Sequence, residues 1–110
     1  MSMSKSNYSI EIYKDNNPSG ARTIWIRLAD DELYMEEQDY SPQLEDIFGR
    51  DNFERFISKI SIDEIRRVLH VYTIEQLIDV LKQMFGKNSG VNDFRAFLDS
   101  NEISYQFGSY

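Results

Sequence analysis

The fold is decided by the stretch TIWIRLADDELYME, residues 23–36 of the 110-residue chain. In each half of this stretch, apolar side chains alternate with other residues, which is the two-residue period of a β-strand. The alternating apolar residues are Ile24, Ile26, Leu28, Leu33 and Met35. Asp30-Asp31, between the two halves, is typical of a turn. Because strands this close in sequence pair most simply with each other, the stretch predicts two antiparallel neighbours. We place Trp25 in the core.

Further strand patterns and one short helix lie on either side of this stretch. Apolar residues alternate over residues 8–12 and 103–107, and less regularly over residues 53–60. Ser41-Pro42 and Gly49 mark the ends of a short helix. Serine caps free amides, proline suits the first turn, and glycine suits the left-handed end of a helix.

The region from residue 61 to residue 98 predicts three helices. Ser61 and Glu64 match the capping-box pattern, in which two side chains satisfy free amides at a helix start, and Thr73 and Gln76 repeat it. The second helix has an apolar stripe that we assign to the core: Leu77, Ile78, Leu81, Met84 and Phe85. The third, shorter helix carries three apolar residues: Phe94, Phe97 and Leu98.

These elements predict an α+β fold in a single domain, residues 1–110, with residues 1–6 as a disordered tail. The expected order is β-β-β-(short α)-β-α-α-α-β. An antiparallel sheet of about five strands with helices packed on one face is the simplest architecture for that order.

Composition excludes several classes of function. The chain has 19 acidic and 12 basic residues, a net charge of −7, which disfavours nucleic acid or an anionic membrane as a partner. The absence of cysteine excludes disulfides, thiolate zinc sites and cysteine nucleophiles. The polar N-terminus does not resemble a signal peptide, and no apolar run approaches the ~20 residues of a membrane span. We therefore expect a cytoplasmic protein, and a monomer.

No catalytic or metal-binding pattern stands out. The single histidine, His70, lies among apolar residues, where we expect a structural or surface role. The acidic residues lack the spacing of a calcium-binding loop, and residues 86–90 lack the lysine position of a phosphate-binding loop. We expect no enzymatic activity, no metal and no cofactor.

The negative charge is concentrated in one window. Residues 30–54 hold ten acidic residues and one basic residue, a net charge of −9, whereas the rest of the chain has a net charge of +2. Clustered carboxylates create a field that steers a basic partner toward them. A solvated surface with no partner is the simpler interpretation, and Glu45 and Asp46 also suit the start of a helix.

Two regions resemble a known class of protein. The first contains SPQLE at residues 41–45 and FGRDNFE at residues 48–54. The second contains FRAFL at residues 94–98 and ISYQF at residues 103–107. Together they are similar to small acidic bacterial immunity proteins of toxin–immunity pairs, including those of contact-dependent growth inhibition. The resemblance implies a cytoplasmic inhibitor that binds one cognate toxin domain.

Charge placement supports the same class. Nuclease active sites are basic because they hold phosphate, so an acidic face can occupy one through charge-assisted hydrogen bonds. We expect the contact carboxylates to be Glu36, Glu37, Asp39, Glu45, Asp46 and Asp51. Tyr40 is the expected aromatic anchor. The alternative is an interaction or accessory domain with an acidic surface and no toxin partner.

Overall fold

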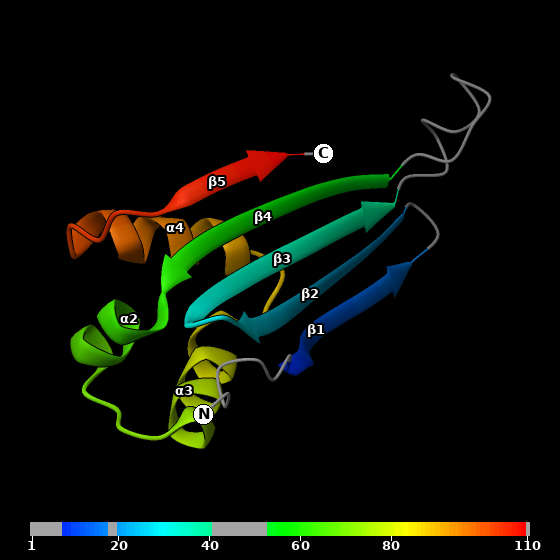
Figure 1. Cartoon of the computed structure of the whole chain (residues 1–110). Coiled ribbons are helices and arrows are strands. Elements are labelled where there is room, and N and C mark those ends of the chain that lie inside the picture. Colours follow the sequence, from blue (N-terminus) through cyan, green and yellow to red (C-terminus); the bar gives the residue numbers. More distant parts are fainter. Residues whose placement is uncertain (1–7, 18–19, 41–52, 110) are drawn as a thin grey trace.

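The computed structural model describes residues 8–17, 20–40 and 53–109 and confirms the predicted α+β fold (Figure 1). Within these residues the strands are β1 (Tyr8–Asn17), β2 (Gly20–Ala29), β3 (Glu32–Tyr40), β4 (Phe53–Ser61) and β5 (Gln106–Ser109). The helices are α2 (Ile62–Leu69), α3 (Ile74–Phe85) and α4 (Gly90–Ser100). The predicted helix at 41–49 and the predicted tail at 1–6 lie outside the described residues.

The five strands form one antiparallel sheet in sequence order, from β1 to β5. In the central hairpin, Ile26 lies opposite Met35, and Ile26 lies opposite Ile10 on the other side. The turn residues Asp30 and Asp31 both have left-handed backbone angles, with φ of 53° and 66°. Aspartate tolerates this conformation better than most residues, which explains the acidic pair at the turn.

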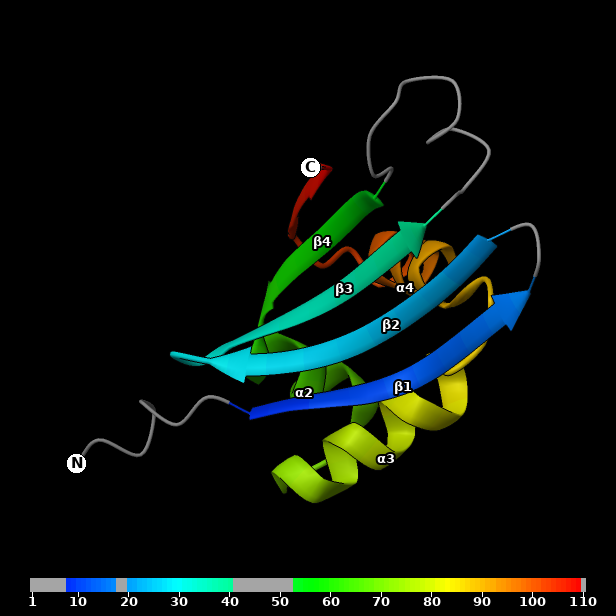
Figure 2. The ribbon, with the colours of Figure 1, turned by 90° about the vertical axis from the view of Figure 1, so that its right-hand side faces the viewer.

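The three helices cover one face of the sheet, and the core lies between the two layers (Figure 2). The alternating residues Ile24, Ile26 and Leu33 are fully or almost fully buried in this core, as predicted. The prediction for Trp25 is wrong, because its neighbours Ile24 and Ile26 take the core face. Successive side chains of a strand point to opposite faces, so Trp25 lies on the face that the described helices leave open.

Two boundaries near the C-terminus differ from prediction. The last helix extends from Gly90 to Ser100, and the closing strand begins at Gln106 instead of residue 103. Ile103 is buried, and its N–H donates to the Leu98 carbonyl at 2.9 Å. The chain therefore remains attached to the end of α4 at Ile103, and it joins the sheet only three residues later.

The two predicted capping boxes have different outcomes. Thr73 accepts a hydrogen bond from the Gln76 N–H at 3.1 Å, and the Gln76 side chain accepts from the Thr73 N–H at 3.2 Å. Ser61 makes no side-chain cap hydrogen bond, so that prediction is wrong. Here the Ile62 N–H donates to the Asp31 carbonyl at 3.0 Å, so the neighbouring turn takes part of the capping role.

This difference gives a stability prediction. Replacing Thr73 with alanine should lower the free energy of unfolding by about 1 kcal/mol, because α3 loses its cap. Replacing Ser61 with alanine is the matched control and should change the free energy of unfolding by less than about 0.5 kcal/mol. Urea unfolding followed by circular dichroism measures both values. Equal losses in the two variants would contradict the assignment of the cap to Thr73.

Candidate functional site

Strand register places three carboxylates and one arginine in a row across four strands. Asp15 of β1 lies opposite Arg22 of β2, which lies opposite Asp39 of β3, which lies opposite Glu54 of β4. Residues that face each other in antiparallel strands share a face, and Arg22 is two residues from Ile24. The row therefore lies on the helix-covered face, at the end of the sheet where β1 joins β2. We call these four residues the acidic end, together with Glu37, which lies on the same face two residues before Asp39.

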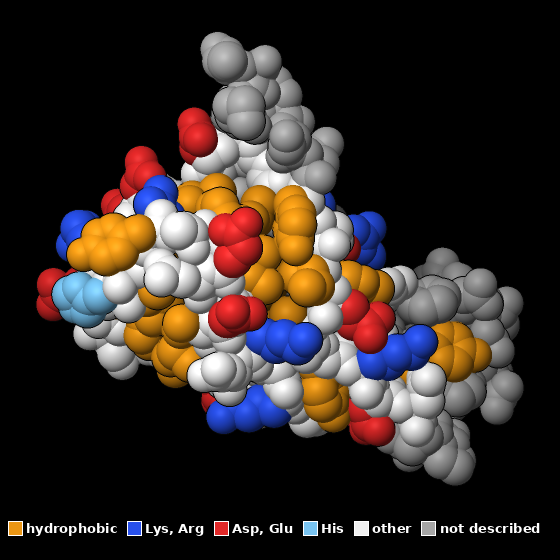
Figure 3. Space-filling view, turned by 90° about the horizontal axis from the view of Figure 1, so that it is seen from below, with side chains coloured by type: hydrophobic (Ala, Val, Ile, Leu, Met, Phe, Trp, Pro, Cys, Tyr) orange, Lys and Arg blue, Asp and Glu red, His pale blue; other side chains and the backbone are white. Residues whose placement is uncertain are grey.

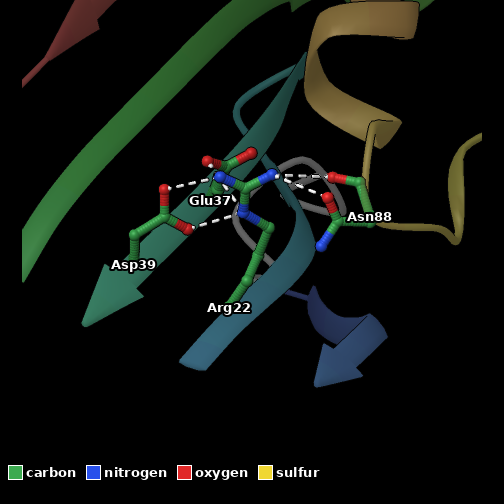
Figure 4. Close-up of polar contacts among 4 residues, drawn as sticks. All are labelled: Arg22, Glu37, Asp39 and Asn88. Carbon is green, nitrogen blue, oxygen red and sulfur yellow. Dashed lines mark hydrogen bonds and ion pairs between the residues drawn. The ribbon is translucent and has the colours of Figure 1, made fainter. Parts of the chain in front are cut away.

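Arg22 is the centre of the acidic end (Figure 4). Its Nε donates to Asp39 Oδ1 at 2.8 Å and its Nη2 donates to Asp39 Oδ2 at 3.0 Å, a bidentate pair. The same Nε lies 3.3 Å from Glu37 Oε2. Nη1 donates to the Asn88 backbone carbonyl at 2.9 Å, so Arg22 also ties the sheet to the loop between α3 and α4. The hydrogen bonds with Asp39 raise the pKa of Arg22 further above its ordinary value.

Glu37 is the buried member of the acidic end, with 6% of its surface exposed. Burial raises the pKa of the Glu37 carboxyl from 4.5 to about 7. The hydrogen bond with Asp39 and the charge of Asp39 act in the same direction, and the charge of Arg22 opposes them. One arginine thus faces two carboxylates, and Glu37 exchanges its proton near neutral pH.

Glu54 is the exposed carboxylate of the acidic end. It lies beside Asp39, and its side chain forms no ion pair within the described residues. Its negative charge also contributes to the raised pKa of Glu37. Glu54 is therefore the member of the acidic end that is best placed to meet a cation from outside.

The predicted contact residues do not share one face. Glu37 and Asp39 lie on the helix-covered face with Arg22, whereas Glu36 and Tyr40 lie on the open face. Glu36 is paired there with Arg55 at 2.5 Å and lies 3.9 Å from Arg27. The remaining predicted contact residues, Glu45, Asp46 and Asp51, lie outside the described residues.

Sequence reasoning missed Arg22, Asp15 and Glu54 as parts of one cluster. A signal for Arg22 was present, because residues equally distant from the Asp30-Asp31 turn face each other in a tight hairpin. By that count Arg22 falls opposite Asp39, as the register shows. Predicting that Asp15 and Glu54 join the cluster requires the register of β1 and β4, which the central hairpin alone does not determine.

The carboxylates of the acidic end are not arranged as a metal-binding centre. Within the described ranges, no group of three or more histidine, cysteine, aspartate or glutamate side chains is placed to hold a metal ion. No described helix is both long enough and apolar enough to cross a membrane. No protein family, curated protein or solved structure matches this chain.

Proposed function

We propose that the chain is an immunity-type inhibitor that binds a cognate bacterial toxin domain, with the acidic end as its contact surface. The observation that carries the proposal is the arrangement of four carboxylates, Asp15, Glu37, Asp39 and Glu54, around the single Arg22. Such an excess of carboxylates attracts a basic surface, and a nuclease active site is a basic surface. A cytoplasmic location follows from this role as part of the same proposal.

The sequence between β3 and β4 adds to this support. Tyr40 and Phe53, which flank residues 41–52, face each other at the end of the sheet next to Asp39 and Glu54. The sequence of residues 41–52 contains Glu45, Asp46 and Asp51 and a single base, Arg50. The sequence that connects Tyr40 to Phe53 therefore carries further negative charge.

The structure changes which substitution tests the proposal. Changing Glu37 to lysine buries a positive charge, and changing Asp39 to lysine removes the partner of Arg22. Either variant disturbs the fold as well as the contact surface, so a loss of binding would have two explanations. Glu54 is exposed and unpaired within the described residues, so Glu54→Lys changes the field and leaves the fold intact. Asp79→Lys on the exposed side of α3 is the matched control, with the same change in charge.

The experiment uses the full chain with the protein encoded immediately upstream of it. Co-purification should give a complex, and stopped-flow measurement at low salt should show Glu54→Lys slowing association by about fivefold, whereas Asp79→Lys changes it by less than about twofold. Added salt should reduce the difference, because screening weakens the field. An association rate that changes neither with Glu54→Lys nor with salt contradicts the proposed contact surface. Failure to form a complex contradicts this partner.

A further inference from the structure

A second surface, which combines basic side chains with an exposed aromatic ring, lies at the connection between α2 and α3. A hollow of about 390 Å³ there is lined by Asp63, Arg66, Arg67, His70, Val71 and Tyr72. His70 ends α2 in a left-handed conformation, with φ of 59°, and its side chain is exposed. The histidine, pale blue in Figure 3, lies on the molecular surface beside a hydrophobic side chain. With two arginines against one aspartate, the hollow has a net positive charge on a protein whose net charge is −7.

Tyr72 is held in place by its backbone. Its N–H donates to Gln76 Oε1 at 3.0 Å, and its carbonyl accepts a hydrogen bond from Arg66 Nη2. The Val71 N–H donates to the Arg66 carbonyl at 3.1 Å, which fixes the preceding residue as well. The side chain of Tyr72 nevertheless remains 80% exposed. A large aromatic ring displayed on a fixed backbone loses little conformational entropy when it binds.

Arg67 is the unpaired base of this hollow. The other described arginines are occupied: Arg22, Arg27, Arg55 and Arg66 pair with carboxylates, and Arg95 stacks on Phe107. Within the described ranges the Arg67 side chain has no such partner, and it is exposed. The negative end of the α2 dipole accounts for basic residues in its last turn. It does not account for an exposed tyrosine beside them.

The hollow is electrostatically separate from the acidic end. α2 begins at the Asp31 end of β3, where the Ile62 N–H bonds the Asp31 carbonyl, and Asp39 lies near the other end of that strand. The nine residues of β3 span about 26 Å, roughly three screening lengths at physiological salt. A ligand in the hollow therefore meets Arg67, His70 and the Arg66–Asp63 ion pair, with little influence from the acidic end.

We propose that the hollow at the α2–α3 corner is a second docking surface, which binds an acidic segment of a partner protein. Arg67 pairs with a carboxylate of the segment, and the Tyr72 ring packs against the neighbouring apolar part. Tyrosine and arginine are the residues that most often carry binding energy at interfaces. This surface goes beyond the proposed inhibitor function, because it has the opposite charge and lies at the other end of β3.

The test uses the full chain and an acetylated peptide of alternating glutamate and leucine (Glu-Leu-Glu-Leu-Glu-Leu) as the probe, at physiological salt. Amide chemical shifts in a ¹H–¹⁵N spectrum should move at residues 66–72 on titration. Arg67→Gln should weaken the fitted affinity by about tenfold, as expected for loss of a charge-assisted hydrogen bond, and Tyr72→Ser should weaken it as well. Lys14→Gln, which removes one exposed positive charge on β1, is the matched control and should leave the affinity unchanged.

Four outcomes of the titration overturn the proposal, and one outcome of light scattering does so as well. They are no shifts at residues 66–72, shifts of equal size in Arg67→Gln, equal weakening by Lys14→Gln, and equal binding of inorganic phosphate, which indicates a simple anion site. Light scattering of the chain alone should give the monomer mass. A mass that rises with concentration and falls to the monomer in Arg67→Gln identifies a second copy as the occupant and also overturns the proposal. None of these results depends on the toxin partner, so the proposed function is tested separately.

Discussion

Replacing Arg22 with alanine is expected to lower the free energy of unfolding by about 3 kcal/mol at pH 8, because Asp39 and Glu37 lose the cation that they share. The Asn88 carbonyl loses its donor in the same step, so the link between the sheet and the α3–α4 loop is lost too. Urea unfolding followed by the fluorescence of Trp25, the single tryptophan, measures the loss. At pH 5 the loss should be smaller, because a protonated Glu37 does not need a cation.

Arg55→Ala is the matched control for this prediction. Arg55 also forms a close ion pair, at 2.5 Å with Glu36, but 47% of its side chain is exposed. Exposed pairs contribute little, so Arg55→Ala should cost less than about 1 kcal/mol. Similar losses in the two variants would mean that burial of the acidic end does not set the strength of the Arg22 contacts.

The sequence predicted the sheet well because strand periodicity is a local signal. Alternation from Ile24 to Met35 determined which residues are buried, and the Asp30-Asp31 turn determined the pairing of the central hairpin. The same alternation should have placed Trp25 on the open face. Its large apolar ring favoured a core assignment, although only one face of an antiparallel sheet needs to be buried.

The acidic end was predicted only in part, because charge density along the sequence does not indicate to which face of the sheet each side chain points. Glu36 and Glu37 are neighbours in the chain, yet they point to opposite faces and have different arginine partners. The window of residues 30–54 contains the carboxylates of β3 but does not separate the two faces of the strand. Their partners Arg22 and Arg55 come from neighbouring strands, and only the register of those strands brings them together.

Glu37 should make the protein less stable as pH rises toward neutrality. Its pKa in the folded chain is about 7, above the ordinary value of 4.5, so the folded state binds a proton more tightly than the unfolded state. The stabilisation from that proton is complete below pH 4.5 and is lost as pH rises through about 7. A shift of this size corresponds to a fall of about 3 kcal/mol in the free energy of unfolding between pH 4.5 and pH 8.

Glu37→Gln should remove this fall. A glutamine has almost the same shape, remains neutral at every pH, and its amide donates to Asp39 as the protonated carboxyl does. The variant should therefore match the native chain at pH 4.5 and exceed its free energy of unfolding by about 3 kcal/mol at pH 8. Unfolding by urea at half-unit pH intervals gives both profiles. Parallel profiles for the two proteins would show that the titration of Glu37 does not control stability.

Glu36→Gln separates the effect of the buried position from the effect of removing a charge. It takes the same charge from the next residue of β3, on the open face, where the ion pair with Arg55 is largely exposed. Its profile should retain the fall with pH, because Glu37 is still present.

A buried carboxylate that lowers stability at neutral pH is typical of a functional position, where a site retains charge at the expense of the fold. If Glu37→Gln is more stable and also associates more slowly with the basic partner, the charge of Glu37 lowers stability but serves binding. If association is unchanged, Glu37 serves only to hold Arg22, and contact with the partner falls to Glu54, the exposed carboxylate of the acidic end.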